Sequence, residues 1–443
     1  TIQDRVQLGL EEVREQFRLA CQTKLIDDCS VMAASEKSEV GHQILGDAGN
    51  LSGDNRLALD SGVEKYLINA GTPAEKDNQS SDFDEILAEL PIGVGQYVDL
   101  EVVRKVPTRL REKDGQLTVT AFNDRIIDIE AGDSRKHAYG VAIDVGTTSV
   151  VGTLLNLQTG EKLAEKGGIN PQTTFGGDLM SRIAYSLYDD KKFANLRVRL
   201  LNALNSLIKD TCESAGIDAK HVYKIVVVGN TCMHHFVLGI NVTYLGLSPY
   251  AASFRRPFTT MATELPFKAV PNARVCFLPV IAGFVGADTL ACILATRIYE
   301  STEVRALVDI GTNGEVVMGS KDKLVACSAP AGPALEGAEI SHGMRGAVGA
   351  IERAKFVDGD FEFAVIGNVP AIGICGSGLI DICSELIASG VMDLTGRLCK
   401  KDVGGLSKTL RKRLRVTDEG TEVILVTSAA SGKKEPVTLT QKD

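Results

Sequence analysis

Tryptophan and the two commonest nucleotide-binding signatures are missing from this chain of 443 residues. The chain has no Gly-x4-Gly-Lys-[Ser/Thr] segment, which excludes a P-loop protein, and no strand–Gly-x-Gly-x-x-Gly–helix unit for a dinucleotide. No run of basic residues would neutralise a phosphate backbone, and the net charge is −9. A nucleic acid partner is therefore not expected.

Paired cysteines and a secretory leader are also missing. The ten cysteines are spread singly, with no Cys-x-x-Cys, which favours reduced thiols in a cytoplasmic protein over a disulfide framework. No basic-then-apolar leader opens the chain. The apolar stretch at 275–295 is interrupted by Pro279, Gly283, Gly286 and Asp288, so a buried loop followed by a core helix is expected rather than a membrane span.

Glycine is plentiful and proline is not, at 44 against 13 residues. This ratio suggests many tight turns, and the length predicts two to four domains. Residues 31–56 are polar and read as a linker. A small α+β middle domain is expected at 57–136, with a helix at 82–89 and strands at 97–106 and 117–129.

A different pattern begins at Tyr139. Strands are predicted at 141–145, 149–157, 162–167 and 224–228, and an amphipathic helix at 191–214. The opening then repeats, because DVGTTS at 144–149 returns as DIGTNGE at 309–315, 165 positions later. Such spacing indicates an internal duplication of a unit of three strands plus helices. The second copy predicts strands at 306–310 and 315–319, and a last clear helix at 379–389.

The two repeated segments carry the residues of a phosphate site. A glycine in a tight turn lets backbone amides approach phosphate oxygens. Asp144 and Asp309 end their strands, where they can hold Mg²⁺ through water, and Asp309 and Glu315 are candidates for handling a hydrolytic water. One such turn alone reads as an ordinary hairpin, but two duplicated copies favour phosphate binding. The candidate contacts in these turns are Gly146, Thr147, Thr148, Gly311, Thr312, Asn313 and Gly314.

Two further segments leave alternatives open, and a third is interpreted as structural. Gly376, Ser377 and Gly378 open a helix, as either an anion site or a tight cap. The polar loop at 170–178 contacts a substrate or partner, or caps a helix at Asp178. His234 and His235 read as structural, because adjacent helical histidines point apart and no acid or cysteine lies at ligand spacing.

Together these segments resemble the superfamily of actin, sugar kinases and chaperone ATPases. Asp144–Ser149 resembles its first phosphate motif, 309–315 its second, and 226–233 (VVVGNTCM), with Gly229 and Asn230, the hinge between halves. The match is closer to the reductive activators of corrinoid proteins, through AIDVGTTSVVGTLL, NPQTTFGGDLMSRI, VVGNTCMHHFVLG, DIGTNGE and ICGSGLID. The fold implied is α/β, a duplicated RNase H-like ATPase domain.

The resemblance also implies a domain order and an iron–sulfur cluster. The halves of the ATPase domain would be 137–304 and 305–443, the second truncated. Cys21 resembles the distant fourth ligand of a plant-type [2Fe–2S] domain, so 1–30 would be a remnant of that ferredoxin-like domain. The first three ligands are absent, so the front of the protein is expected to be missing. The end is expected to be cut as well, because no late Gly-Gly adenosine motif or second hinge segment is found, and the cluster is expected only in a full-length protein.

The function implied is an ATP- and Mg²⁺-dependent activator that returns Co(II) corrinoid to Co(I). Its partners would be a corrinoid protein or corrinoid methyltransferase and a low-potential electron donor, with a homodimer possible and no membrane partner. A small-molecule kinase of the same fold and a nucleotide-gated binding module remain as alternatives. The activators of radical dehydratases would need a cysteine-bound cluster at a dimer interface, of which the dispersed cysteines give no sign.

Overall fold

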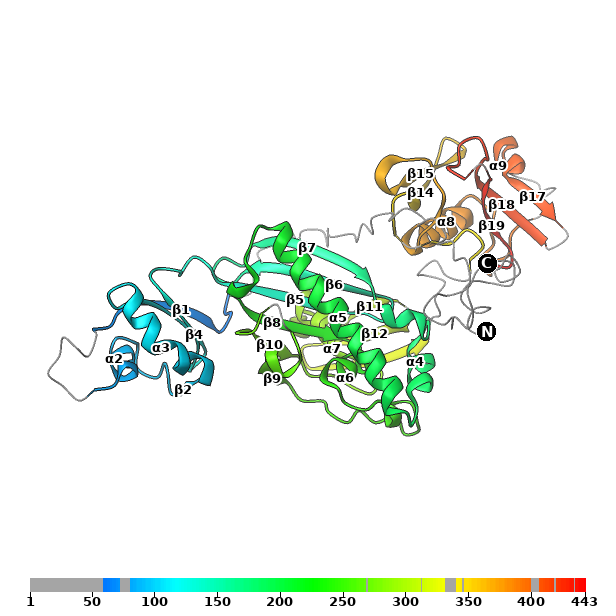
Figure 1. The fold of residues 1–443 in the computed structure, drawn as a ribbon. Coiled ribbons are helices and arrows are strands. Elements are labelled where there is room, and N and C mark those ends of the chain that lie inside the picture. The colour runs from blue at the N-terminus through cyan, green and yellow to red at the C-terminus, as the bar shows by residue number, and fades with distance from the viewer. Residues whose placement is uncertain are drawn as a thin grey trace, which may run out of the picture. The chain divides into compact units, whose positions relative to one another are not determined.

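The computed structural model describes residues 59–71, 80–267, 270–311, 313–330, 340–344, 346–399, 406–417, 420–433 and 435–443 (Figure 1). The expected ferredoxin-like remnant, the expected linker, Cys21 and Thr312 lie outside these residues. The described residues mix helices with five sheets, which confirms the predicted α/β class.

The region at 61–131 is a four-stranded sheet with two helices. The predicted helix at 82–89 is confirmed as α2 (Asp82–Ala88), and the hydroxyl of Ser81 caps it. The sheet order is β1-β3-β4-β2. Its strands are β1 (Val63–Asn69), β2 (Tyr97–Val98), β3 (Gln116–Phe122) and β4 (Arg125–Ala131).

The strand predicted at 97–106 is wrong, because only its first two residues pair and helix α3 (Leu100–Glu112) follows. The valine-rich sequence favours a strand by composition. Its buried residues, however, are Val102, Val106 and Leu110, and spacing by four is the period of a helix. The single strand predicted at 117–129 is a hairpin, turned where Asn123 takes the left-handed conformation at φ 54°.

A six-stranded sheet follows, in the order β7-β6-β5-β8-β10-β9. The central strands β5, β8 and β10 are parallel, and the others join antiparallel. The four strands predicted here are confirmed. The bounds are β5 (Tyr139–Val145), β6 (Ser149–Asn156), β7 (Lys162–Ile169), β8 (Val222–Gly229), β9 (Phe258–Met261) and β10 (Arg274–Phe277).

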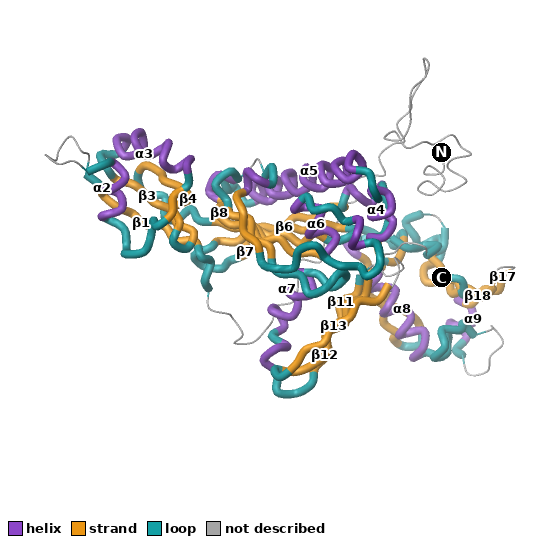
Figure 2. The backbone as a smooth tube through the Cα atoms, turned by 90° about the horizontal axis from the view of Figure 1, so that it is seen from below, coloured by secondary structure: helices purple, strands orange, loops and turns teal. Residues whose placement is uncertain are grey.

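Helices cover this sheet on two sides (Figure 2). The predicted long helix is α5 (Asp190–Ser214), which buries Leu200, Leu204 and Ile208. On the opposite face lies α7 (Ala287–Thr296), preceded by β10 and a glycine-containing loop. The described ranges contain no helix long and apolar enough to cross a membrane. The shorter elements are η3 (Pro171–Thr174), α4 (Leu179–Ser186), η4 (Ala219–His221), α6 (Thr231–Leu238), η5 (Thr243–Leu245), η6 (Ala262–Glu264) and η7 (Ile298–Glu300).

The repeated motif builds a second set of three antiparallel strands, as predicted: β11 (Arg305–Ile310), β12 (Asn313–Ser320) and β13 (Lys323–Pro330). One face packs through Leu307, Val317 and Leu324 on Ile293 and Ile298. The side chains of that face include Asp309 and Glu315, which are cross-strand partners.

The remaining residues have a core of their own. The predicted last helix is α8 (Gly376–Ala388), packed on β14 (Ala350–Val357). A further short helix, α9 (Lys408–Arg413), was not predicted, because its basic sequence has little apolar periodicity. The other elements are β15 (Asp360–Val365), η9 (Ile366–Asn368), β16 (Gly373–Ile374), β17 (Leu414–Thr417), β18 (Gly420–Val426) and β19 (Val437–Thr440).

Candidate active site

Four carboxylates interact electrostatically at the ends of the two repeated hairpins and of α7. Asp144 is the next-to-last residue of β5 and Asp309 that of β11. Glu315 stands opposite Asp309 on β12, and Asp288 is the second residue of α7. The thiol of Cys292 senses all four charges, which together with burial raise its pKa to about 11. The fold thus gathers acids from three separate segments.

Burial raises the pKa values of all four acids, and the charges of neighbouring acids add to it at Asp144, Asp288 and Glu315. Burial, followed by the charges of Asp288 and Asp309, raises the pKa of Asp144 to about 7. Burial and Asp309 raise the pKa of Asp288, against a 2.7 Å hydrogen bond from the amide of Thr289. Burial raises the pKa of Asp309. It also raises that of Glu315, opposed by a 2.9 Å hydrogen bond from the hydroxyl of Ser328.

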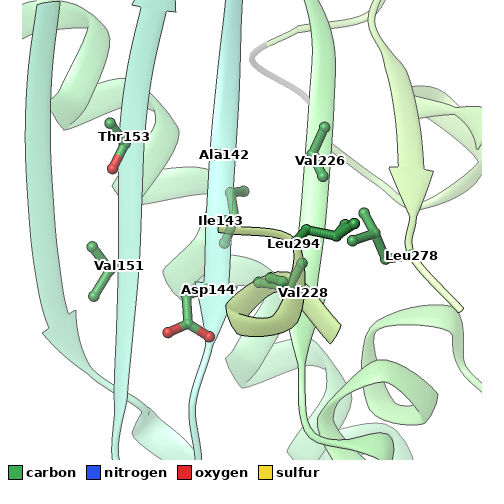
Figure 3. Close-up of a pocket in the computed structure, with 10 residues that line it drawn as sticks. Ala142, Ile143, Asp144, Val151, Thr153, Val226, Val228, Leu278 and Leu294 are labelled. Carbon is green, nitrogen blue, oxygen red and sulfur yellow. The ribbon is translucent and has the colours of Figure 1, made fainter. Parts of the chain in front are cut away.

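Asp144 lies at one side of a cavity of about 320 Å³ between the sheet and α7 (Figure 3). The carboxylate is exposed to solvent at this side of the cavity, and the apolar side chains beside it offer it no hydrogen-bond donors. The lining is otherwise apolar apart from Thr153, and includes Val151, Val226 and Leu294. A carboxylate so placed favours a cation as counter-ion, because few protein dipoles stabilise its charge.

The residues fit Mg²⁺ held through water. Within the described residues, no three acids, histidines or cysteines converge closely enough to bind a metal directly. Mg²⁺ usually keeps several waters and needs only one or two carboxylates. The mutual repulsion of Asp144, Asp288 and Asp309 would be relieved by a divalent cation among them.

Asp288 is the residue that sequence reasoning missed as a site residue. Its signal was available, since it is the one charged residue of α7, in the first turn of an otherwise apolar helix. Gly286 explains its placement. A Cβ at Gly286 would lie 2.4 Å from the Cα of Asn230 and 2.5 Å from the carbonyl oxygen of Gly229. Glycine therefore lets the start of α7 reach the end of β8.

The first loop, Gly146–Thr148, lies against the end of β8. A Cβ at Gly146 would stand 2.8 Å from the carbonyl oxygen of Ser149, so the turn is tight. Gly229 has φ 153°, and a Cβ there would meet the carbonyl of Val145 at 2.5 Å. Asn230 caps α6 and donates from Nδ2 to the hydroxyl of Thr147 at 3.1 Å. The structure thus brings the predicted hinge residues into contact with the first loop.

The second loop is shorter by one residue. From Asp309 to its cross-strand partner Glu315 there are seven residues, counting both. From Asp144 to its partner Val151 there are eight. The amide of Gly311 donates to the carbonyl of Asn313 at 3.1 Å. Asn313 and Gly314 begin β12, so these predicted contacts lie in the strand beside Glu315.

The glycine-rich start of α8 has a packing role. A Cβ at Gly378 would stand 2.0 Å from the carbonyl oxygen of Ile351 on β14, so the helix crosses that strand at close range. Ser377 is exposed and Gly376 half-buried.

Helix capping, one of the two alternatives for the 170–178 loop, is seen at Asp178, and a contact of this loop with a substrate or partner stays a prediction. Asp178 caps α4 by accepting from the amide of Ser181 at 2.9 Å. His235 accepts from the amide of Ser253 and pairs through Nδ1 with the carbonyl of Thr231. Burial lowers the pKa of His234 to about 4, so it is neutral. Neither histidine belongs to a metal-binding group within the described ranges, in line with the structural interpretation.

Comparison with protein-family models places three matches end to end along the chain. The RACo linker region matches residues 52–136 and the RACo middle region 139–301. The C-terminal domain of RACo, the ASKHA domain, matches 303–443.

Two curated relatives and one solved structure are similar over much of the chain. The corrinoid activation enzyme RamQ of Eubacterium limosum is 32% identical over 96% of this chain and 70% of its own length. The [Co(II) methylated amine-specific corrinoid protein] reductase of Methanosarcina barkeri is 27% identical over 58% and 52%. A reductive activator for corrinoid, iron–sulfur protein superposes with TM-score 0.77 at 32% identity, covering 88% of this chain and 62% of that one. The chain therefore spans roughly half to two thirds of these proteins.

Proposed function

The chain belongs to the RACo family of reductive activators of corrinoid proteins, and from this premise we propose that it couples ATP to the return of a Co(II) corrinoid to Co(I). The substrate is the Co(II) corrinoid of a corrinoid protein or methyltransferase, which gains one electron. The electron comes from a low-potential donor, and ATP with water gives ADP and phosphate.

One observation carries the ATP part of the proposal. Asp144 and Asp309, from the two copies of one motif, both add to burial in raising the pKa of the Cys292 thiol, and the charge of Asp309 adds to burial in raising the pKa of Asp144. A hairpin that only made a turn would not need, in both copies, a strand-end carboxylate whose pKa is raised. Convergence of the two copies on one place indicates a shared ligand that carries Mg²⁺.

Roles within the site follow from position. Asp144 and Asp309 would hold Mg²⁺ through water, with Asp288 as a third anchor. Bound Mg²⁺ would neutralise phosphate charge and orient the phosphates. Glu315 and Asp309 stand side by side on one sheet face, where either would accept a proton from water. Gly146, Thr147 and Asn230 would line the phosphates, with Gly311–Gly314 opposite.

The electron path belongs to residues outside those described. We propose a [2Fe–2S] cluster only in a full-length protein, because Cys21 alone cannot bind one and four cysteine ligands are needed. We also propose a cytoplasmic protein, since its ATP and reduced thiols are found there, and leave a homodimer as an expectation. Gly376, Ser377 and Gly378 remain candidate nucleotide contacts.

ATP hydrolysis by the full-length protein tests the proposal. Hydrolysis should be measured with and without a corrinoid protein poised at Co(II), and should rise when that protein is present. Asp144→Ala should abolish the stimulated rate. Asp210→Ala, which removes an exposed acid of α5, should leave it unchanged. Transfer of phosphate to a small hydroxyl compound, with no response to the corrinoid protein, would replace the proposal with a kinase.

A further inference from the structure

A fully buried polar cluster lies directly behind the first loop. Asn170, Gln172 and Arg182 each have none of their surface exposed. Arginine is almost never fully buried without a specific reason, since its guanidinium loses hydration. Gln172 in turn donates from Nε2 to the carbonyl of Leu196 on α5 at 3.2 Å, which anchors the cluster to the core helix.

Three successive carbonyl oxygens of the loop accept hydrogen bonds from this cluster. Nδ2 of Asn170 donates to the oxygen of Gly146 at 2.9 Å, and the backbone amide of Asn170 donates to that of Thr148 at 2.8 Å. Nη2 of Arg182 donates to the oxygen of Thr147, between them.

Arg182 is itself fixed by further contacts. Its Nε donates to the carbonyl of Gly176 at 2.9 Å, and its Nη1 lies 3.4 Å from Oε1 of Gln172. The side chain therefore joins the 170–178 loop to the phosphate loop, and its position does not depend on solvent.

The direction of the carbonyls determines the direction of the amides. Peptide bonds in this loop are trans, and in a trans peptide the N–H points opposite to the C=O of the preceding residue. With the oxygens of Gly146, Thr147 and Thr148 turned into the cluster, the amides of Thr147, Thr148 and Ser149 are turned away from it. Successive amides on one side form a concave site for an anion.

We propose that Arg182 and Asn170 are positioning residues for phosphate binding, which hold the first loop with three amides directed at the phosphates of the nucleotide. Neither side chain touches the nucleotide. The buried guanidinium also places a positive charge behind the loop, on the side opposite the anion. The inference rests on the proposed function, and gives the buried polar part of the 170–182 segment a role that helix capping does not explain.

Nucleotide affinity of the full-length protein tests this proposal, with ATP, ADP and adenosine as probes in the presence of Mg²⁺. Arg182→Met should weaken ATP and ADP binding about 10-fold to 100-fold, because the charge-assisted hydrogen bond is lost and the carbonyl of Thr147 loses that donor. Adenosine, which has no phosphate, should bind as before. Arg182→Lys keeps the charge and should recover part of the affinity.

Arg197→Met is the matched control. Arg197 is a half-buried arginine of α5 that donates to the carbonyl of Val237 at 3.4 Å. Its removal should lower thermal stability without changing the ratio of ATP to adenosine affinity. Equal weakening of ATP and adenosine in Arg182→Lys, or no weakening in either Arg182 variant, would overturn the positioning role. If the unaltered protein binds no ATP, the proposed function itself fails.

Discussion

The two hairpins that share one sequence motif lie in different surroundings. The loop of the first, between β5 and β6, is held from behind by Asn170, Arg182 and Asn230. The second, between β11 and β12, belongs to a three-stranded sheet whose strand β11 is half-buried at most. The motif thus occurs as two turns, and within the described ranges a buried polar support is seen behind the first of them only.

The acids differ as well. Asp144 faces Val151 across the first hairpin, whereas Asp309 faces Glu315 across the second. The first copy therefore combines one carboxylate with a rigid phosphate loop. The second combines two carboxylates, the arrangement suited to proton transfer. On the proposed function, we expect the first copy to bind the phosphates and the second to assist hydrolysis.

Removing either strand-end carboxylate should have the largest effect. Asp144→Asn and Asp309→Asn should each lower the ATPase rate about 100-fold to 1000-fold, because each removes charge that holds Mg²⁺ against the phosphates. Steady-state ATPase assays over a range of Mg²⁺ concentrations check this. A rate that stays within a few fold in either variant contradicts a shared Mg²⁺ site.

Glu315→Gln should remove the proton acceptor that we assign to the second hairpin. The amide cannot accept a proton, so kcat should fall about 100-fold while KM for ATP changes little. Ser328→Ala serves as the milder neighbour, since it removes only the hydrogen bond that stabilises the ionised Glu315. A rise in KM at constant kcat would assign Glu315 to binding instead.

Glycine substitutions should separate the two turns by stability. A Cβ at Gly146 would lie 2.8 Å from a backbone oxygen, whereas at Gly311 it would lie 3.4 Å from one. Gly146→Ala should lower the free energy of unfolding by about 1–3 kcal/mol. Gly311→Ala should change it by about 0.5 kcal/mol or less. Equal losses in chemical denaturation would show that the loops are equally tight.

A smaller effect is expected on the affinity for Mg²⁺–ATP, which should depend on pH through the protonation of Asp144. Its pKa of about 7 lies above the ordinary value of 3.8, so protonation competes with Mg²⁺ below pH 7. Affinity should rise up to about tenfold per pH unit below pH 7 and level off above it. Titration calorimetry at pH 6, 7 and 8 checks this, and Asp144→Asn should remove the dependence.

The raised pKa of Asp144 also predicts how the folding stability of the metal-free protein depends on pH. A folded pKa above the unfolded value means that the folded state holds the proton longer. Stability is therefore present at low pH and is lost as pH rises from about 4 towards 7. Asp144→Asn should raise the melting temperature at pH 8 relative to the unaltered protein. A lower melting temperature at that pH would show that the charge is well stabilised without metal.

Much of the fold followed from local patterns in the sequence. Alternation and helical spacing were strong at β5, β6, β8 and α5, where one face of each element is buried. The patterns failed at α3, because valines on a helix look like a strand when the partner surfaces are unknown. Helix α9 was missed for another reason, because Leu410 is its one buried residue and so gives no apolar periodicity.

The candidate site was predictable only in part. The repeated Asp-x-Gly-Thr motif identified Asp144 and Asp309, because a duplicated motif can be recognised within a single sequence. Asp288 and Arg182 were not, since their importance lies in tertiary contacts that bring α7 to the end of β8 and α4 to the first loop. Acids and arginines are common on helices, so only burial shows which of them matter.

The most direct test of the central claim is the cobalt spectrum of a corrinoid protein held at Co(II), with the full-length protein and excess low-potential reductant, before and after Mg²⁺–ATP is added. The account predicts that Co(I) forms only after ATP is added, and does not form with Asp144→Ala. Formation of Co(I) at the same rate without ATP, or no Co(I) while ATP is consumed, would contradict it.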